Sequence, residues 1–290
     1  MSDPLDGRSC LVTGATGGIG FEIARGLARR GAHVIMHGRT RARAEAAATA
    51  VREKVKGARL ETVSGDLASL ENVRAIAAEV DRRHHDLDVL VNNAGVLMTR
   101  LELTVDGYET TFAVNHLATY LLTNLLLPNL RRTGHGRVVT LASVAHRTGA
   151  IDFDNLKGEK GFSSFPTYCN SKLANVLFTM ELARRTEGTG VTANCLHPGA
   201  INTGLWRRSG PIALAFSVFG PIFPNAARGA DTAIHLAGDA GVADISGAYF
   251  HKRRMQRPAK QAFDADVAVR LWDLSAQVTG VDGTVGVATA

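Results

Sequence analysis

Tyr168 and Lys172 are the residues whose types and spacing most directly suggest chemistry. They are four residues apart in a predicted helix over 167–186, so their side chains share one face. A phenol with a pKa of about 10 is a poor acid-base catalyst at neutral pH, and an adjacent ammonium favours the phenolate. The pair is therefore predicted to transfer a proton; the alternative is that Tyr168 is a half-buried packing residue.

Two further polar residues are candidates for the same site. Ser143 follows a predicted strand over 137–141 and could donate a hydrogen bond to a substrate oxygen, or bond only to the local chain. Asn115 lies in a predicted helix over 107–130 that is otherwise apolar on its inner side. Its amide could instead satisfy backbone groups in a bent helix. Three neighbours are expected to have structural or packing roles: His116, Cys169 and His197.

A glycine-rich turn is predicted between the first strand, over 9–13, and a helix over 18–30. Glycine permits a tight turn and a close approach of the backbone to a pyrophosphate, which then lies on free N–H groups at the helix start. Glycine also marks ordinary turns, so the strand before it and the helix after it carry the inference. The candidate cofactor-binding residues of this turn are Gly14, Thr16, Gly17, Gly18, Ile19 and Gly20.

The second strand, over 33–36, is followed by Arg39, where an NAD site would have a carboxylate for the ribose hydroxyls. The planar guanidinium suits a 2′-phosphate, so NADP(H) is predicted over NAD(H), although Arg39 could also be a solvated residue at a helix start. Asp66 and Leu67 follow the third strand and could hold the adenine amine. The segment after the fourth strand is expected to lie along the cofactor, with Asn92, Ala94 and Gly95 as its candidate residues.

Short apolar runs typical of buried parallel strands alternate with amphipathic helical stretches along the whole chain. The predicted strands are 9–13, 33–36, 59–63, 89–91, 137–141, 191–195 and 247–250. The predicted helices are 18–30, 41–55, 70–83, 107–130 and 167–186. We find no repeat or linker, and this alternation predicts the α/β class: residues 1–290 form a single-domain, doubly wound Rossmann fold with a parallel sheet of about seven strands and helices on both faces. Ligands of such a sheet bind at the carboxyl ends of its strands.

The composition excludes disorder, collagen and coiled coil, since 45% of the residues are hydrophobic and 21% are charged. The formal charge is +6, but the basic residues are scattered, so no nucleic-acid partner is predicted. Three distant cysteines indicate a reducing compartment without disulfides and offer no metal site. The start of the sequence lacks a signal peptide pattern, and the apolar stretch 211–224 is too short to span a bilayer. A cytoplasmic protein with no integral membrane segment is therefore expected.

Taken together and in order, these motifs resemble those of the short-chain dehydrogenase/reductase family. The glycine turn, Asn-Asn-Ala-Gly at 92–95, Asn115, Ser143, Tyr-x-x-x-Lys at 168–172 and Pro-Gly at 198–199 all follow its pattern. The finer match is to the retinol dehydrogenase-like branch, which the stretches 106–117, 168–178, 196–199 and 271–275 resemble.

The resemblance implies a role for each candidate. Tyr168 would be the proton donor or acceptor, and Ser143 would polarise the carbonyl. Lys172 would lower the tyrosine pKa and bind the nicotinamide ribose, while Asn115 would hold a water in a proton relay. Pro198, Gly199 and Thr203 would close over the nicotinamide. The family is often dimeric or tetrameric through its long helices, so a homodimer or homotetramer is implied as well.

The substrate is expected to be a small lipophilic aldehyde, ketone or alcohol. The segment 201–225 is rich in Leu, Ile, Phe and Pro and lies where the family folds a substrate lid. A second apolar wall over 147–166 contains Phe153, Leu156, Phe162 and Phe165. Both segments could also be ordinary packing at the sheet edge. A steroid or polyketide ketoreductase, and a non-catalytic NADPH-binding sensor, are the alternative functions.

Overall fold

An eight-stranded sheet runs through the computed structural model, which describes residues 3, 5–199 and 226–281. The strands are β1 Ser9–Val12, β2 His33–Gly38, β3 Arg59–Ser64, β4 Val89–Asn92, β5 Arg137–Leu141, β6 Thr192–Leu196, β7 Tyr249–His251 and β8 Arg254–Gln256. Their order is β3-β2-β1-β4-β5-β6-β7-β8, and only the β7–β8 pairing is antiparallel. The order reverses between β1 and β4, where such sheets bind dinucleotides.

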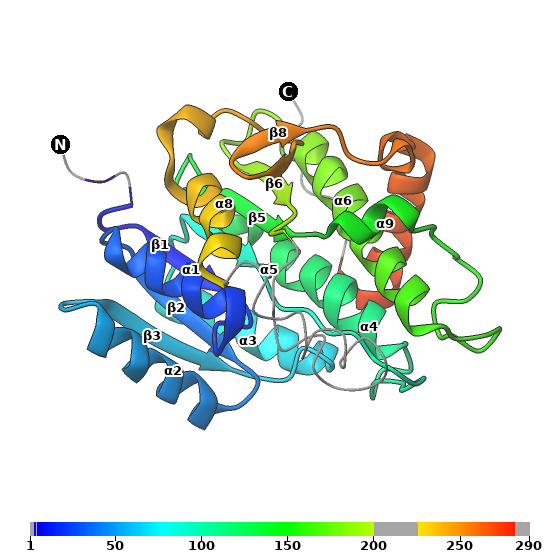
Figure 1. Ribbon diagram of the computed structural model, residues 1–290, viewed down its shortest axis with the longest axis horizontal. Helices are drawn as coiled ribbons and strands as arrows, with labels where there is room; N and C mark the ends of the chain where they lie inside the picture. The colour runs from blue at the N-terminus through cyan, green and yellow to red at the C-terminus, as the bar shows by residue number, and fades with distance from the viewer. Residues whose placement is uncertain (1–2, 4, 200–225, 282–290) are drawn as a thin grey trace.

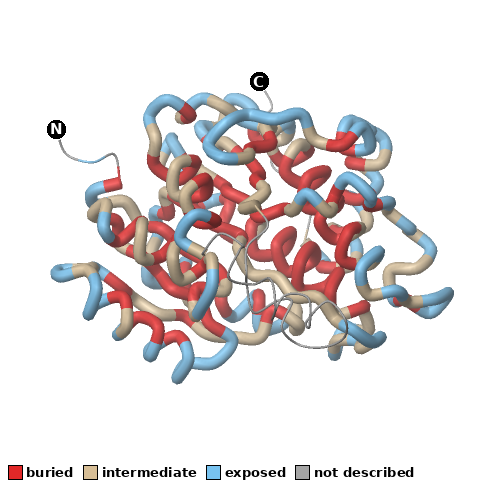
Figure 2. Tube along the Cα trace, viewed as in Figure 1, coloured by how far each residue is buried: buried red, intermediate tan, exposed pale blue. Residues whose placement is uncertain are grey.

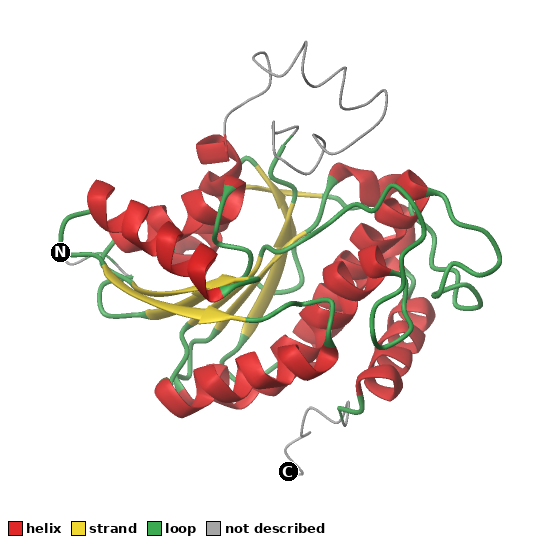
Figure 3. Cartoon of the chain, turned by 90° about the horizontal axis from the view of Figure 1, so that it is seen from below, coloured by secondary structure: helices red, strands yellow, loops and turns green. Residues whose placement is uncertain are grey.

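Helices cover both faces of the sheet (Figures 1 and 3). One face carries α1 Gly18–Arg29, α2 Arg41–Lys54 and α8 Ala226–Gly238. The other carries α3 Leu70–Arg83, α5 Ala118–Arg132, α6 Ser164–Arg185 and α9 Ala265–Thr279. Among the helices of the described residues, none has both the length and the apolar character that a membrane span requires. The predicted α/β doubly wound fold is confirmed.

The two cores are built by alternating residues of the same strands. In β1, Cys10 and Val12 pack toward α1 and α8, whereas Leu11 packs toward α3 and α5. In β4, Val91 packs toward α1 and α8, and Leu90 packs toward α3 and α5. Both faces of these two central strands are therefore apolar, as a covered parallel sheet requires, and they lie in the buried centre of Figure 2.

All seven predicted strands are present within one or two residues, but the sheet has an eighth, β8. Its residues Arg254, Met255 and Gln256 are exposed, so no apolar run indicates a strand. The two-residue turn before it places Lys252 and Arg253 at positive φ, 50° and 60°. Asn-Gly is the usual sequence of such a turn, so this hairpin lacks its common sequence signal.

The predicted helix over 107–130 is wrong in one respect: it is divided. α4 Thr110–Phe112 leads into a π-helical turn, Ala113–Leu117, and only then into α5. The buried carboxylate of Glu109 caps the start by accepting hydrogen bonds from the backbone N–H groups of Thr111 and Phe112, each at 2.8 Å. The π turn contains Asn115, and such turns occur frequently at functional sites.

Candidate active site

The predicted glycine turn connects β1 to α1 with two residues in the left-handed region. Gly14 and Gly18 have φ of +64° and +54°, which L-residues with a side chain rarely adopt. Gly17 caps α1 without a side-chain hydrogen bond, and open space surrounds both Gly17 and Gly18. A helix start without a side-chain cap, beside open space, fits the phosphates of a dinucleotide.

Gly20 is the glycine that the packing of this turn requires. A Cβ there would lie 2.3 Å from the carbonyl oxygen of Gly14 and 2.3 Å from Nδ2 of Asn93. Gly20→Ala is therefore expected to lower the free energy of unfolding by about 1–3 kcal/mol, as overpacking does. Gly17→Ala is the matched control, because its φ of −179° and open surroundings accept a methyl group. Equal chemical denaturation midpoints for the two variants would contradict this geometry.

Thr13 and Asn93 join the ends of β1 and β4 beneath the turn. The Thr13 hydroxyl accepts hydrogen bonds from the backbone N–H groups of Asn93 and Ala94, both at 3.0 Å. Nδ2 of Asn93 donates to the Thr13 carbonyl at 2.7 Å. Asn92, the residue singled out from the sequence, instead donates to the Thr123 hydroxyl on α5 at 2.9 Å. Asn93 is thus the positioning residue that the sequence analysis missed.

His37 is a second missed positioning residue. It lies buried at the end of β2, where its Nδ1 accepts a hydrogen bond from the Gly14 backbone N–H at 3.2 Å. Its Nε2 lies 3.0 Å from the carbonyl of Gly65, so the tautomer that satisfies both contacts carries its proton on Nε2. Burial lowers the pKa of His37, which keeps the ring neutral and able to accept from Gly14.

The remaining adenine-side candidates lie at the same edge. Arg39 is exposed just beyond β2, and the preceding Gly38 lies so close to Thr16 that a Cβ would be 2.6 Å from its methyl carbon. Asp66 accepts a hydrogen bond from the backbone N–H of Ala68 at 3.0 Å, and Leu67 is buried. The exposed Arg39 therefore directly follows Gly38, which packs against Thr16 of the glycine turn.

Tyr168 and Lys172 lie on one face of α6, as predicted from their spacing. Nζ of Lys172 is 5.7 Å from the centre of the Tyr168 ring, and it donates to the Leu141 carbonyl at the end of β5 at 3.1 Å. Both residues are buried. Ser143, two residues beyond Leu141, makes a side-chain hydrogen bond with Tyr168. The structure thus brings together three of the four candidate catalytic residues.

Asn115 lies close to the same lysine. A Cβ on Gly95 would be 3.3 Å from both Nζ of Lys172 and Oδ1 of Asn115, so Gly95 lies between the motifs. Asn115 Oδ1 accepts from the Val96 backbone N–H at 2.7 Å, and its Nδ2 donates to the Val96 carbonyl at 3.0 Å and to the Ser171 hydroxyl at 2.9 Å. These contacts satisfy backbone groups of the loop after β4, whereas the alternative interpretation was that Asn115 satisfies backbone groups within its own bent helix.

Two histidines hold the chain around Ser143. Nδ1 of His146 donates to the Ser143 carbonyl at 2.6 Å, while Nε2 accepts from the Ala259 backbone N–H at 3.0 Å. Nδ1 of His197 accepts from the backbone N–H groups of Val144 and Gly199, both at 3.3 Å. Burial lowers the pKa of His197 to about 4, so the ring is neutral and can accept both bonds. His197 therefore has a structural role, as expected, and His146 is a further residue that the sequence did not indicate.

Burial controls the protonation of the central pair. It raises the pKa of Tyr168 to about 12, and the hydrogen bond with Ser143 opposes that rise only in part. It lowers the pKa of Lys172 from 10.5 to about 8. Burial therefore favours the neutral phenol in the protein alone, which opposes the phenolate that an adjacent ammonium favours. At neutral pH Tyr168 holds its proton and Lys172 is still charged.

The other expected packing residues are buried. His116 lies 2.9 Å from the Ser275 hydroxyl of α9 through Nε2, and burial lowers its pKa to about 3. The Cys169 thiol lies 3.3 Å from the Thr148 hydroxyl. Pro198 and Gly199 follow β6, and the φ of Gly199 is +97°. Thr203 and the expected lid over 201–225 lie outside the described residues.

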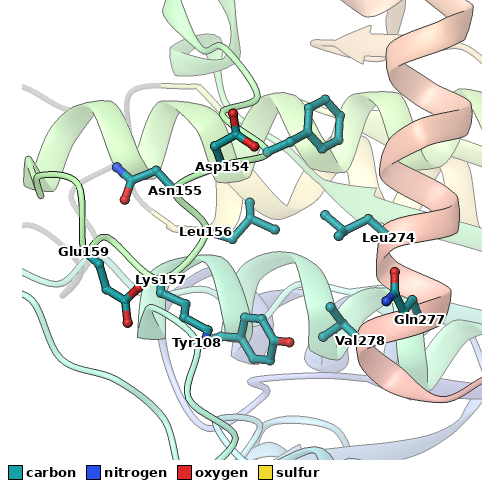
Figure 4. Close-up of a pocket in the computed structure, with 10 residues that line it drawn as sticks. Tyr108, Asp154, Asn155, Leu156, Lys157, Glu159, Leu274, Gln277 and Val278 are labelled. Atoms are coloured by element: carbon teal, nitrogen blue, oxygen red, sulfur yellow. The ribbon is translucent and has the colours of Figure 1, made fainter.

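The residues of the second apolar wall lie in two different environments. Phe153 and Leu156 pack toward α9 and line a cavity of about 390 Å³ with Leu274 and Val278 (Figure 4). The guanidinium of Arg270 covers the Phe153 ring at 4.1 Å. These two residues therefore pack against α9 as well as lining a cavity, and their part in a substrate wall stays a prediction. Phe165, by contrast, is 46% exposed one helical turn before Tyr168.

Comparison with known proteins identifies the family of the chain. A family model described as short chain dehydrogenase matches residues 8–211. The chain belongs to the short-chain dehydrogenase family, as its motifs predicted.

Its relatives include several retinol dehydrogenases. Mouse retinol dehydrogenase 12 is 40% identical over 277 residues, covering 96% of this chain and 88% of the relative. Human retinol dehydrogenase 13 is 41% identical over 285 residues, covering 96% and 86%. Among solved structures, an uncharacterised protein from Mycobacterium paratuberculosis is 35% identical with a TM-score of 0.77, covering 96% of this chain and 95% of that one. A putative NAD(P)-dependent gluconate 5-dehydrogenase from Beutenbergia cavernae, solved with bound NADP, is 31% identical with a TM-score of 0.70, covering 87% and 97%.

Proposed function

We propose that the chain is an NADP(H)-dependent oxidoreductase that interconverts a lipophilic aldehyde or ketone and its alcohol, with Tyr168 as general acid/base. The observation that carries the proposal is the meeting of Tyr168, Lys172 and Ser143 at the end of β5, with Gly95 linking them to Asn115. The bound nicotinamide would supply the hydride donor or acceptor. The residues of this chain would supply the proton and the orientation.

In the reducing direction, Tyr168 starts as the protonated phenol, as its pKa of about 12 favours. The hydroxyl of Ser143 donates to the substrate oxygen and holds it beside the phenol, and Tyr168 gives that oxygen its proton. Lys172 has three N–H donors, so it can hold the Leu141 carbonyl and a ribose hydroxyl at once. Asn115 is held in place by hydrogen bonds to Val96 and Ser171. We propose that it also holds a water in a proton relay.

Arg39 supports the choice of NADP(H), because an exposed guanidinium at the end of β2 can pair with a 2′-phosphate. Arg39→Leu is expected to raise the KM for NADPH by about 10–100-fold, the value of a charge-assisted hydrogen bond, and to change the KM for NADH little. Arg41→Leu is the matched control, since Arg41 is exposed on α2 and paired with Glu45 at 2.8 Å. Steady-state kinetics with both cofactors measures this. An equal change for both cofactors in Arg39→Leu would argue against the NADP(H) assignment.

The lipophilic substrate rests on two observations. The exposed side chains of Val144 and Phe165 provide apolar surface next to Ser143 and one turn before Tyr168. The relatives are named for retinol, an apolar alcohol. We would follow NADPH oxidation with aldehydes and ketones of increasing chain length and ring content. A kcat/KM that rises with apolar size supports the proposal; NADPH binding without turnover of any carbonyl would favour the non-catalytic sensor.

A further inference from the structure

Three potential metal ligands gather away from the reaction site, at the edge of the sheet formed by β2 and β3. They are His33, the first residue of β2; Glu61 of β3; and His84, which caps the end of α3. In the part of the chain that the structure describes, this is the one group of three or more histidine, cysteine or acidic side chains whose ligand atoms all lie within 4.8 Å of one another.

The register of the sheet explains why they meet. Glu61 is paired with Ile35, and Ile35 packs toward α3. His33 lies two residues before Ile35, so both His33 and Glu61 project from the same face toward that helix. α3 ends at Arg83, and the next residue, His84, lies over this face.

The spacing of the ligand atoms suits a small divalent ion. Oε1 of Glu61 lies 3.1 Å from Nε2 of His33, Oε2 of the same carboxylate lies 3.2 Å from Nε2 of His84, and one ligand atom from each residue lies within 4.8 Å of the other two. Ligand atoms in a tetrahedral zinc site are about 3.3 Å apart, because each lies about 2.0–2.1 Å from the ion. Two imidazoles and one carboxylate are also ligands that zinc prefers.

The surroundings allow a cation to enter. Nη1 of Arg83 lies 3.6 Å from Oε2 of Glu61, but Arg83 also pairs with Glu79 and keeps that partner if it leaves Glu61. The side chain of Glu61 is 36% exposed, which gives an ion access from solvent.

We propose that His33, Glu61 and His84 bind one Zn²⁺ ion, with water in the fourth position, and that the ion ties the edge strand β3 to β2 and α3. His33 begins β2, whereas His37 and Arg39 follow at the other end of the strand near the glycine turn. The proposed zinc site is therefore separate from the proposed reaction. No local spacing in the sequence indicates this site, because its three ligands come from β2, β3 and the end of α3.

The test is a titration of the chelator-treated full chain with zinc chloride, followed by calorimetry and by the midpoint of thermal unfolding. We expect one Zn²⁺ per chain at this site and a higher unfolding midpoint with zinc. His84→Ala is expected to weaken this binding by at least about 100-fold, since even residues that only support a metal ligand are worth about 10–100-fold. His85→Ala is the matched control, because this exposed neighbouring histidine is outside the cluster.

Glu61→Gln is a second test in case His84→Ala fails to fold. It keeps the size of the side chain and removes only the charge. It should weaken zinc binding as well and leave the circular dichroism spectrum of the native protein unchanged. The ligand field of Co²⁺, read from its visible absorption, should report a tetrahedral site in the original chain and lose that signature in His84→Ala. Equal zinc affinity in the original chain, His84→Ala and Glu61→Gln, or no zinc binding by the original chain, would overturn the proposal.

Discussion

Tyr168→Phe is expected to reduce kcat for carbonyl reduction by about 10²–10⁴-fold, the usual contribution of a positioned proton donor. The substitution removes one hydroxyl and keeps the ring, which is 5% exposed, so the core around α6 stays packed. The Ser143 hydroxyl loses a partner but still accepts a hydrogen bond from the Ala145 backbone N–H at 3.2 Å. NADPH affinity should therefore change little.

Steady-state kinetics and fluorescence titration of NADPH separate these two effects. Tyr108→Phe is the matched control, because Tyr108 lines the cavity against α9 and should keep its full kcat. If Tyr168→Phe retained more than about a tenth of the original kcat, another group would have to supply the proton.

Lys172→Met is expected to abolish most of the activity and yet to stabilise the protein without cofactor. The pKa of Lys172 is about 8 in the folded chain, against 10.5 for a free lysine, so folding at neutral pH buries a charge at a cost of about 3 kcal/mol. Methionine has a similar length and no charge. The Leu141 carbonyl loses the lysine but still accepts a hydrogen bond from Nδ2 of Asn175 at 3.3 Å.

The gain in stability of Lys172→Met over the original protein should decrease as the pH rises. Because the folded-state pKa of Lys172 is lowered, the unfolded chain binds more protons between pH 8 and 10.5, and the stability of the original protein rises across that range. The advantage of Lys172→Met should therefore shrink from about 3 kcal/mol at pH 7 to about 1 kcal/mol at pH 10. Urea denaturation at the two pH values measures it, with exposed Lys160→Met as control. A variant less stable than the original at pH 7 would contradict the buried charge.

The motifs that could be predicted were those with local signals. A strand, a glycine turn and a helix lie together in the sequence, so the β1–α1 turn followed from residues 9–30. The four-residue spacing placed Tyr168 and Lys172 on one face for the same reason. The exposed strand β8 gave no such signal, because it contains no buried residue.

The residues that were missed depend on contacts between distant segments. His37 reaches both Gly14 and Gly65, and His146 joins Ser143 to Ala259, so neither partner can be read from neighbouring residues. The direction of Asn92 could have been predicted. Leu90 packs toward α5, and strand alternation sends the side chain two residues later to the same face, where Thr123 lies.

The effect of burial on the pKa values of Tyr168 and Lys172 could not be predicted from the sequence. The pairing of Tyr168 with Lys172 predicts a lowered tyrosine pKa only if both groups keep their hydration. In the folded chain both are buried, so the pKa of Tyr168 is raised and the pKa of Lys172 is lowered, and each shift favours the neutral form of the group. The same desolvation keeps His37 and His197 neutral as hydrogen-bond acceptors.

The transfer of deuterium from NADPH labelled at the nicotinamide C4 to a lipophilic aldehyde tests the proposed hydride transfer. Mass spectrometry of the product alcohol after a single turnover measures it. We expect a deuterium-labelled alcohol from the original chain, and almost none from Tyr168→Phe although that variant still binds NADPH. Labelled alcohol at equal rates from both proteins, or none from the original chain with any aldehyde or ketone while NADPH is bound, would contradict it.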